Sequence, residues 1–341
     1  MTVNQPKGLF FIHWKSIIVV ILTLGVNIVH AQDPQLTQFY AAPTYLNPAF
    51  AGATPCWRAG LNYRNQWFLG PRPYTTYMAW LDKNLRKIRS GVGGYIYYDG
   101  IGSGAFQTYE FAAQFAHEIN INDDLKFRLG IQPSYHLKYY TLGTNFSYGD
   151  EYTNLEGRVN GTSDAANIPG SLQFFDLSSG ALVYSEKFWL GFASHHMLRP
   201  FFGPTRSDRV PIKFSVHGGF KIQLNDYYES ILKPAFQVRS QAGNLQTDLG
   251  VYYERDKLIL GAWYRGIPVL STDAAINQDA FAIMGGVKIQ SFQIAYSYDL
   301  PITKMIYTYG SHELSAIFEF CIYRGKRKPP RNVQQLPCPV F

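Results

Sequence analysis

The feature of this chain that most constrains its fold is residues 125–139, where apolar and polar side chains alternate without a break. The odd positions from Leu125 to Tyr139 are apolar, aromatic or proline, and the even positions between them are Lys, Arg, Gly, Gln, Ser and His. A strand sorts such a sequence onto two faces, whereas a helix scatters it around its circumference. Strands of soluble proteins usually have about 5–6 residues, so this length favours a strand that crosses a membrane.

Alternation of this kind recurs in about fourteen segments, which are separated by turn residues such as Asp99-Gly100. Longer polar connections near 141–171, 198–211 and 266–279 contrast with the short turns. This asymmetry is typical of outer-membrane barrels, so we predict an all-β fold, a transmembrane antiparallel β-barrel of about 14 strands. A secreted β-sandwich is the alternative, because its strands also alternate. The predicted strands begin near Arg58, Thr75, Val92, Phe106, Leu125, Phe175, Phe188, Lys213, Leu232, Leu245, Leu258, Phe281, Phe292 and His312.

Composition and charge favour the membrane interpretation. Only 16% of the 341 residues are charged, whereas a soluble domain has about 25%. The formal net charge is +7, but much of the excess gathers in a short tail, so a nucleic-acid-binding surface is not indicated. We expect this tail, 322–341, in the periplasm, where it meets an acidic partner or lipid phosphates, or is only solvated. Its basic residues are Arg324, Lys326, Arg327, Lys328 and Arg331.

The N-terminal end has the features of an export signal. Lys7 and Lys15 precede an apolar run over 17–29, and Val29-His30-Ala31 then offers small residues at a cleavage point before Gln32. The sequence predicts a signal peptide over 1–31, an N-terminal periplasmic or lumenal segment over 32–55, an outer-membrane β-barrel over 56–321 and a basic periplasmic tail over 322–341.

Residues 33–52 precede the first predicted strand and do not alternate. Asp33 is expected to cap a short helix that has Pro34 at its first position and ends at Pro43. An apolar helix ahead of a barrel needs a place to bury its face. We therefore expect a plug-like segment that enters the lumen or packs at the periplasmic rim, with a simple linker as the alternative.

No arrangement of residues indicates catalysis. The sequence has no Gly-x-Ser-x-Gly elbow, His-Glu-x-x-His motif, phosphate-binding loop or Cys-x-x-Cys pair. Ser194 and His195 are adjacent in sequence only. On one strand His195 and His196 face opposite ways, which disfavours a shared metal. We expect no enzyme activity, no metal and no cofactor.

Charged residues on the polar faces allow two interpretations. They line a conduit, or they pair across the lumen and hold a filled interior together; the recurrence of both signs favours the second. The basic residues are Arg58, Arg64, Lys126, Arg128, Lys138, Lys213, Lys221, Arg239 and Arg265, and the acidic ones are Glu110, Glu118, Asp248, Glu254 and Glu313.

Three cysteines occur, Cys56, Cys321 and Cys338. The periplasm favours disulfides, and a bond between Cys321 and Cys338 would close a loop around the basic run. In the chain-entropy model such a loop contributes about 3 kcal/mol. We predict this bond, with two free thiols as the alternative.

Two runs of sequence ahead of the barrel resemble the opening motif of the PorP/SprF family of the type IX secretion system. They are Asp33-Pro34-Gln35-Leu36-Thr37-Gln38-Phe39-Tyr40 and Tyr45-Leu46-Asn47-Pro48-Ala49-Phe50-Ala51-Gly52. The resemblance continues at Asp176 to Gly180, His196 to Pro200, Ala295 to Asp299, Ser311 to Ser315 and Cys338 to Phe341, and it is weakest at 141–171. Its motif residues, expected to bind a partner or to plug the barrel, are Asp33, Pro34, Gln38, Phe39, Tyr40, Asn47, Pro48, Phe50 and Gly52.

The resemblance implies a non-enzymatic outer-membrane component of the type IX secretion system. Members support secretion and surface attachment of a cargo, such as a gliding adhesin, that carries a C-terminal sorting domain. The expected partners are outer-membrane lipid, that cargo, and periplasmic ring or peptidoglycan-associated components, which the N-terminal segment and the tail would face. The alternatives are a passive outer-membrane pore and a barrel enzyme acting on lipid or protein.

Overall fold

A computed structural model describes residues 33–69, 73–102, 104–140, 170–202, 209–225, 230–266, 280–302 and 309–321. The chain divides into Met1–Asp33, of which only Asp33 is described, and Pro34–Phe341. All described strands belong to the second unit. No helix in these ranges is long and apolar enough to cross a membrane.

The strands begin close to the alternating segments of the sequence. They are β1 (Trp57–Gln66), β2 (Tyr74–Leu85), β3 (Ser90–Ile101), β4 (Phe106–Asn120), β5 (Lys126–Tyr140), β6 (Ser171–Tyr184), β7 (Phe188–His195), β8 (Lys213–Phe220), β9 (Ile222–Asn225), β10 (Ser230–Gln241), β11 (Asn244–Arg255), β12 (Leu258–Gly266), β13 (Ala280–Ile289), β14 (Phe292–Pro301) and β15 (Ser311–Phe320). The short helical turns are η1 (Phe39–Ala41), α2 (Pro43–Leu46), η2 (Pro48–Phe50) and η3 (Arg86–Ile88).

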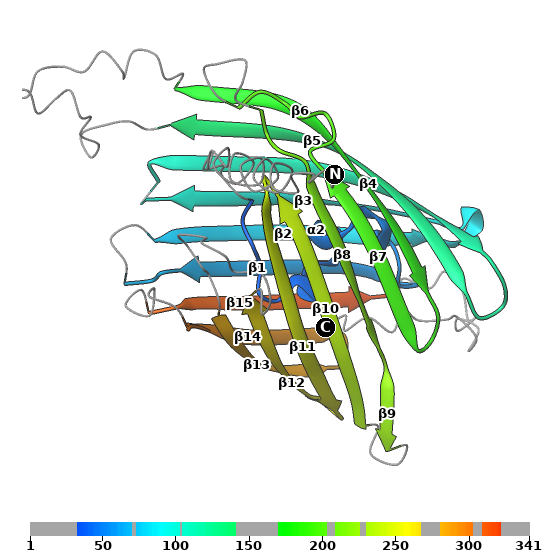
Figure 1. The fold of residues 1–341 in the computed structure, drawn as a ribbon. Helices are drawn as coiled ribbons and strands as arrows, with labels where there is room; N and C mark the ends of the chain where they lie inside the picture. The colour runs from blue at the N-terminus through cyan, green and yellow to red at the C-terminus, as the bar shows by residue number, and fades with distance from the viewer. Residues whose placement is uncertain are drawn as a thin grey trace, which may run out of the picture. The chain divides into compact units, whose positions relative to one another are not determined.

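These strands form one closed antiparallel sheet (Figure 1). Apart from β8 and β9, consecutive strands pair with each other, and β15 returns to pair with β1 along the whole length of both. The short β9 continues β8 and pairs with the same strand, β10, so the fifteen elements make a 14-stranded barrel. The predicted transmembrane barrel is confirmed and the sandwich is excluded, because closure leaves no free sheet edge, as a strand structure in lipid requires.

The two faces of the sheet have opposite character. On β5, Arg128 and Gln132 point inward and are almost fully buried, whereas Leu129 and Ile131 point outward and are 49% and 46% exposed. Large apolar side chains are exposed in the same way on the outward faces of most other strands. In lipid such a face is covered by acyl chains, so its exposure is not a destabilising feature.

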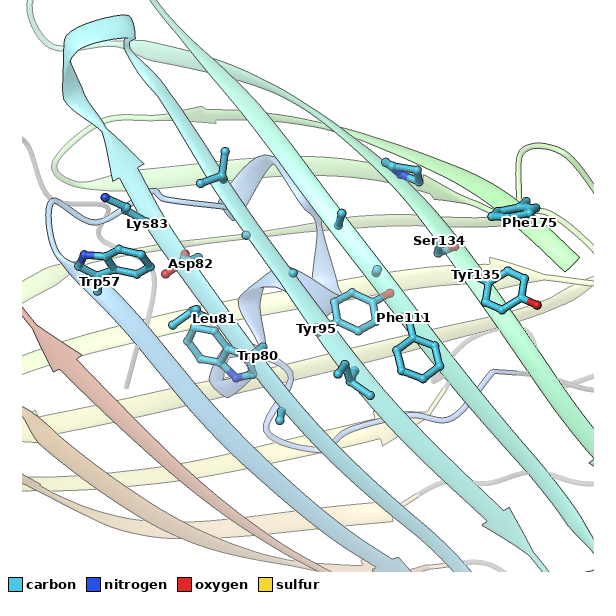
Figure 2. Close-up of a pocket in the computed structure, with 18 residues that line it drawn as sticks. Trp57, Trp80, Leu81, Asp82, Lys83, Tyr95, Phe111, Ser134, Tyr135 and Phe175 are labelled. Carbon is cyan, nitrogen blue, oxygen red and sulfur yellow. The ribbon is translucent and has the colours of Figure 1, made fainter. Parts of the chain in front are cut away.

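The outer wall carries one apolar hollow of about 780 Å³ that crosses β1 to β6 (Figure 2). Outward side chains such as Leu81, Phe111 and Phe175 line it, and its floor includes the small residues Gly94 and Ala113. The missing side-chain volume at those positions makes the depression. Its apolar lining is suited to the acyl chains that surround a membrane barrel.

The two ends of the barrel differ in the length of their connections. At one end the strands are joined by short turns such as 121–125, 256–257 and 290–291, which we call the turn end. At the other end lie the connections 141–170, 196–212 and 267–279, which we call the loop end. In outer-membrane barrels the long loops are extracellular and the short turns periplasmic.

Candidate functional site

The interior of the barrel is occupied by residues 34–53, which we call the lumenal segment. Tyr40, Ala42, Asn47 and Phe50 have no exposed surface. The segment runs from inward residues near the loop end, at Thr37, to inward residues near the turn end, at Gly52. It therefore passes through the barrel before the chain enters β1.

The local conformation of this segment differs from the sequence prediction. No helix begins at Asp33; the first helical turn is η1, and Pro43 starts α2 instead of ending a helix. Proline suits the first helical position, because its missing N–H has no partner there in any case. Pro48 starts η2 in the same way, and the Asn47 side chain caps that turn by accepting from the Ala49 N–H at 2.8 Å.

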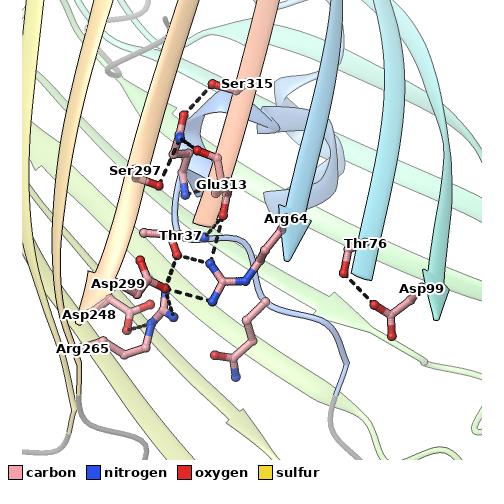
Figure 3. Close-up of polar contacts among 12 residues, drawn as sticks. Thr37, Arg64, Thr76, Asp99, Asp248, Arg265, Ser297, Asp299, Glu313 and Ser315 are labelled. Carbon is pink, nitrogen blue, oxygen red and sulfur yellow. Dashed lines mark hydrogen bonds and ion pairs between the residues drawn. The ribbon is translucent and has the colours of Figure 1, made fainter. Parts of the chain in front are cut away.

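The first anchor of the lumenal segment is a charged network around Thr37 and Gln38 (Figure 3). Glu313 on β15 accepts hydrogen bonds from both backbone N–H groups, at 2.6 and 3.0 Å. The Thr37 hydroxyl donates to Asp299 on β14 at 2.6 Å. Arg64 on β1 donates to the same hydroxyl and pairs with Asp299 at 2.9 Å and Glu313 at 3.1 Å.

This network balances its charges within the lumen. Arg265 pairs with Asp299 at 3.2 Å and with Asp248 at 3.4 Å, and Arg239 pairs with Asp248 at 2.8 Å. Together with Arg64 and Glu313 this gives three guanidinium groups and three carboxylates, all nearly buried. Buried charges are tolerated when they are paired and their remaining hydrogen-bonding groups are satisfied. Both carboxylate oxygens of Glu313 accept hydrogen bonds from backbone N–H groups of the lumenal segment.

The second anchor is Asn47. Its side-chain N–H₂ donates to the carbonyl oxygens of Ala181 on β6 and Phe192 on β7, both at 3.1 Å, and lies 3.1 Å from Nε2 of His217 on β8. One amide thus links the middle of the lumenal segment to three strands. Tyr40 packs nearby against Trp189, with ring centroids 5.7 Å apart.

The third anchor lies near the turn end. Arg128 donates to the carbonyl oxygens of Ala49 at 2.9 Å and Ala51 at 2.5 Å. Asp82 on β2 accepts from the Gly52 N–H at 2.9 Å and forms a two-point ion pair with Arg58. Arg128 therefore binds carbonyl oxygens of the lumenal segment, and Asp82 binds one of its N–H groups.

Glycines in the wall let the lumenal segment approach closely. A Cβ atom at Gly130 would lie 2.4 Å from the Ala49 nitrogen, and one at Gly91 would lie 2.0 Å from the Ala51 oxygen. Either distance is far below van der Waals contact, so these positions accept only a hydrogen as side chain. The wall of β3 and β5 is thus shaped to this backbone.

The motif residues named from the sequence gather in this interior. Gln38, Phe39, Tyr40, Asn47, Pro48, Phe50 and Gly52 are all buried there, and Asp33 and Pro34 are half-buried. The barrel wall covers most side chains of 36–53. The contact between the N-terminal segment and periplasmic components stays a prediction.

The charged residues named from the sequence mostly pair with one another, which favours the filled interior over the conduit. Lys126 and Arg128 pair with Glu118, and Lys213 lies over the Tyr45 ring. Lys221 is exposed, because it interrupts the strand between β8 and β9. Asp82 and Asp299 were not named from the sequence among the paired charges of the lumen. Both lie at inward positions of their strands, and the alternation of apolar and polar residues could have identified those positions.

The predicted disulfide is wrong. Cys321 bonds to Cys56, not to Cys338, and the Cα atoms of the bonded pair are 4.7 Å apart. The two cysteines flank the paired strands β1 and β15, so closure of the barrel brings them together across 265 residues of sequence. Cys338 and the basic tail residues lie outside the described residues.

Comparison with solved structures finds β-barrels of low identity. A Pseudomonas aeruginosa FadL homologue is 13% identical, with 82% of this chain and 94% of that chain covered and a TM-score of 0.45. The TodX monoaromatic hydrocarbon channel deltaS2 mutant is 12% identical, with 82% and 92% covered and a TM-score of 0.44. BamA from Haemophilus ducreyi lacking POTRA domains 1–3 is 11% identical, with 77% and 70% covered and a TM-score of 0.40.

No curated protein matches the chain. A family model does match it over residues 28–318, and its description is type IX secretion system membrane protein PorP/SprF. The match includes the lumenal segment and nearly all of the barrel. The chain therefore belongs to the PorP/SprF family and is an outer-membrane component of the type IX secretion system.

Proposed function

We propose that this protein is a plugged, non-enzymatic anchor that supports secretion and surface attachment of a cargo protein with a C-terminal sorting domain, such as a gliding adhesin. The observation that carries this proposal is the lumenal segment, which is held to the wall at three levels by buried hydrogen bonds and ion pairs. A barrel filled in this way is suited to holding a partner, not to conducting solutes.

The cargo is gripped at the loop end. The longest connections between strands in the sequence belong to that end, and binding residues of rigid scaffolds are commonly carried on such loops. The turn end and the basic tail face the periplasmic ring or peptidoglycan-associated components.

Co-purification tests the cargo assignment. A tagged full-length barrel, extracted in mild detergent from cells that secrete a sorting-domain cargo, is expected to bring that cargo down with it. An unrelated outer-membrane barrel with the same tag is the control. Normal display of every sorting-domain protein in a deletion strain would overturn the assignment.

Planar-bilayer recording tests the plug. The purified wild-type protein is expected to show almost no steady conductance. A stable open channel with residues 33–52 intact would favour the passive pore. Retained cargo display after Ser194→Ala and His195→Ala is expected, and loss of display with the barrel still folded would point to an enzyme.

A further inference from the structure

A second polar cluster lies on the inner wall at the loop end, outside the three anchors of the lumenal segment. His136 belongs to β5, Asp176 belongs to β6, and His196 follows the last residue of β7. One donor atom from each lies within 4.8 Å of the other two. The three residues are buried, with 3%, 3% and 8% of their surface exposed.

The sheet register brings the first two residues together. His136 pairs with Phe174 and Ser134 pairs with Asp176, so His136 and Asp176 are diagonal neighbours on the inward face of β5 and β6. Diagonal neighbours of this kind are within reach of long side chains.

His196 joins the cluster because the strand has already ended. β7 stops at His195, and His196 has a left-handed φ of 60°, which is uncommon for a residue with a side chain. Strand alternation therefore no longer separates the two histidines onto opposite faces. The His196 ring turns to Asp176, with Nδ1 and Oδ2 2.5 Å apart.

We propose that His136, Asp176 and His196 form a binding site for a divalent transition-metal ion, with zinc as the ion that fits best. Two imidazoles and one carboxylate are a recurrent zinc donor set that leaves a fourth position open. Calcium and magnesium prefer oxygen donors. A tetrahedral zinc with bonds of about 2.1 Å spaces its donors about 3.4 Å apart. The donor atoms here are between 2.5 Å and 4.8 Å apart, so this spacing lies within their range and small side-chain adjustments complete the site.

The surroundings orient the donors in the manner of a metal site. Nε2 of His136 lies 3.0 Å from the Ser134 hydroxyl and 3.8 Å from Glu110 Oε1. Asp176 Oδ1 accepts from the Leu177 N–H at 2.7 Å. The Phe174 ring stacks on His136 with centroids 4.8 Å apart. Outer partners of this kind fix ring orientation and raise metal affinity.

A bound ion would join three elements at the mouth of the barrel. It would tie β5 and β6 to the start of the connection 196–212, which contributes to the surface at the loop end. This role concerns the mouth alone, so it does not depend on the cargo assignment.

Zinc titration of the full-length barrel tests the site. The protein is purified in detergent without a histidine tag, treated with EDTA, and carries Cys338→Ser so that this thiol does not bind the probe. Elemental analysis after gel filtration is expected to find one zinc per chain. His136→Gln and His196→Gln are each expected to weaken zinc binding by more than about tenfold in competition with a chromogenic chelator.

His117→Gln is the matched control, since His117 is an exposed histidine near the turn end of β4 and is expected to leave zinc binding unchanged. Heat-modifiable gel migration shows whether each variant is folded. No saturable zinc in the wild type would overturn the proposal and leave Asp176 and His196 as a hydrogen-bonded pair. Equal affinity in the folded His136→Gln, His196→Gln double variant would also overturn it.

X-ray absorption spectroscopy of the zinc-loaded wild type keeps the proposal testable where a variant does not fold. Two imidazole ligands and one oxygen ligand are expected. Zinc coordinated without imidazole would exclude this site.

Discussion

Asn47→Ala is the sharpest test of how the lumenal segment stays in place. The Asn47 side chain has no exposed surface. It accepts from the Ala49 N–H at 2.8 Å and donates to the carbonyl oxygens of Ala181 and Phe192 at 3.1 Å each. Alanine removes all three contacts and leaves those backbone groups buried.

The size of the effect follows from these contacts. A hydrogen bond of this kind contributes about 1 kcal/mol net. The bond to Ala49 lies within the lumenal segment and is kept when the segment is displaced, so the two bonds to Ala181 and Phe192 set the effect, about 2 kcal/mol. Because about 1.4 kcal/mol corresponds to a tenfold change in an equilibrium constant, the population of the displaced form of the lumenal segment should rise about 30-fold. The anchors at Arg64 and Arg128 remain, so the barrel itself is expected to stay folded.

Single-channel recording measures the displaced form directly, as the fraction of time in which the barrel conducts. Asn47→Ala is expected to raise this fraction about 30-fold over the wild type. Asn120→Ala, at the exposed end of β4, is the matched control and is expected to change nothing. An Asn47→Ala protein with wild-type conductance and a wild-type unfolding midpoint would refute the reasoning.

Three further substitutions test other contacts, each by the temperature at which the barrel loses its heat-modifiable gel migration. Gly130→Val places a side chain against the Ala49 backbone and is expected to destabilise the barrel by about 1–3 kcal/mol. Gly285→Val is the control and should behave as the wild type, because a Cβ atom there meets nothing within 4 Å. Equal midpoints for the two variants would contradict the close fit at Gly130. Arg64→Ala removes the ion pair of the buried Glu313 and leaves Asp299 with Arg265 alone, so it should cost about 3–5 kcal/mol. Lys288→Ala, at an exposed position, should stay within about 0.5 kcal/mol of the wild type. A small loss for Arg64→Ala would show that the network is dispensable. Cys56→Ser removes the disulfide to Cys321 and should lower the stability of the barrel by up to about 5 kcal/mol. A reducing agent should lower the stability of the wild type by the same amount and leave that of the variant unchanged. A loss of stability in Cys338→Ser instead would support the Cys321–Cys338 bond predicted from the sequence.

Strand positions and faces followed from the sequence because they depend on local periodicity. The alternation from Leu125 to Tyr139 placed Arg128 and Gln132 on one face and Leu129 and Ile131 on the other, and the structure has them so. A one-residue shift would reverse every side chain, so alternation over this length leaves little freedom. The same logic located the starts of the other barrel strands within two residues, except that β6 begins at Ser171, four residues before the expected Phe175.

Pairing between distant residues could not be predicted from the sequence, because it depends on how the sheet closes. Cys321 lies seventeen residues from Cys338 and 265 from Cys56, and sequence distance favoured the nearer partner. The register of β15 on β1 brings the distant one within bonding distance. Asp82 and Asp299 were missed for a related reason, since their cations lie on other strands and only the register makes them partners.

His195 and His196 show the same difference between what the local pattern predicts and what the tertiary structure decides. Adjacent positions on a strand face opposite ways, and this rule argued against a metal at His195 and His196. It fails at His196 because β7 ends one residue earlier and a left-handed turn redirects the ring. The sequence by itself determined which residues form strands and which face meets lipid, because both are set by neighbours along the chain. Only the tertiary structure decided what fills the barrel and which groups meet inside it, because closure of the sheet fixes those distances.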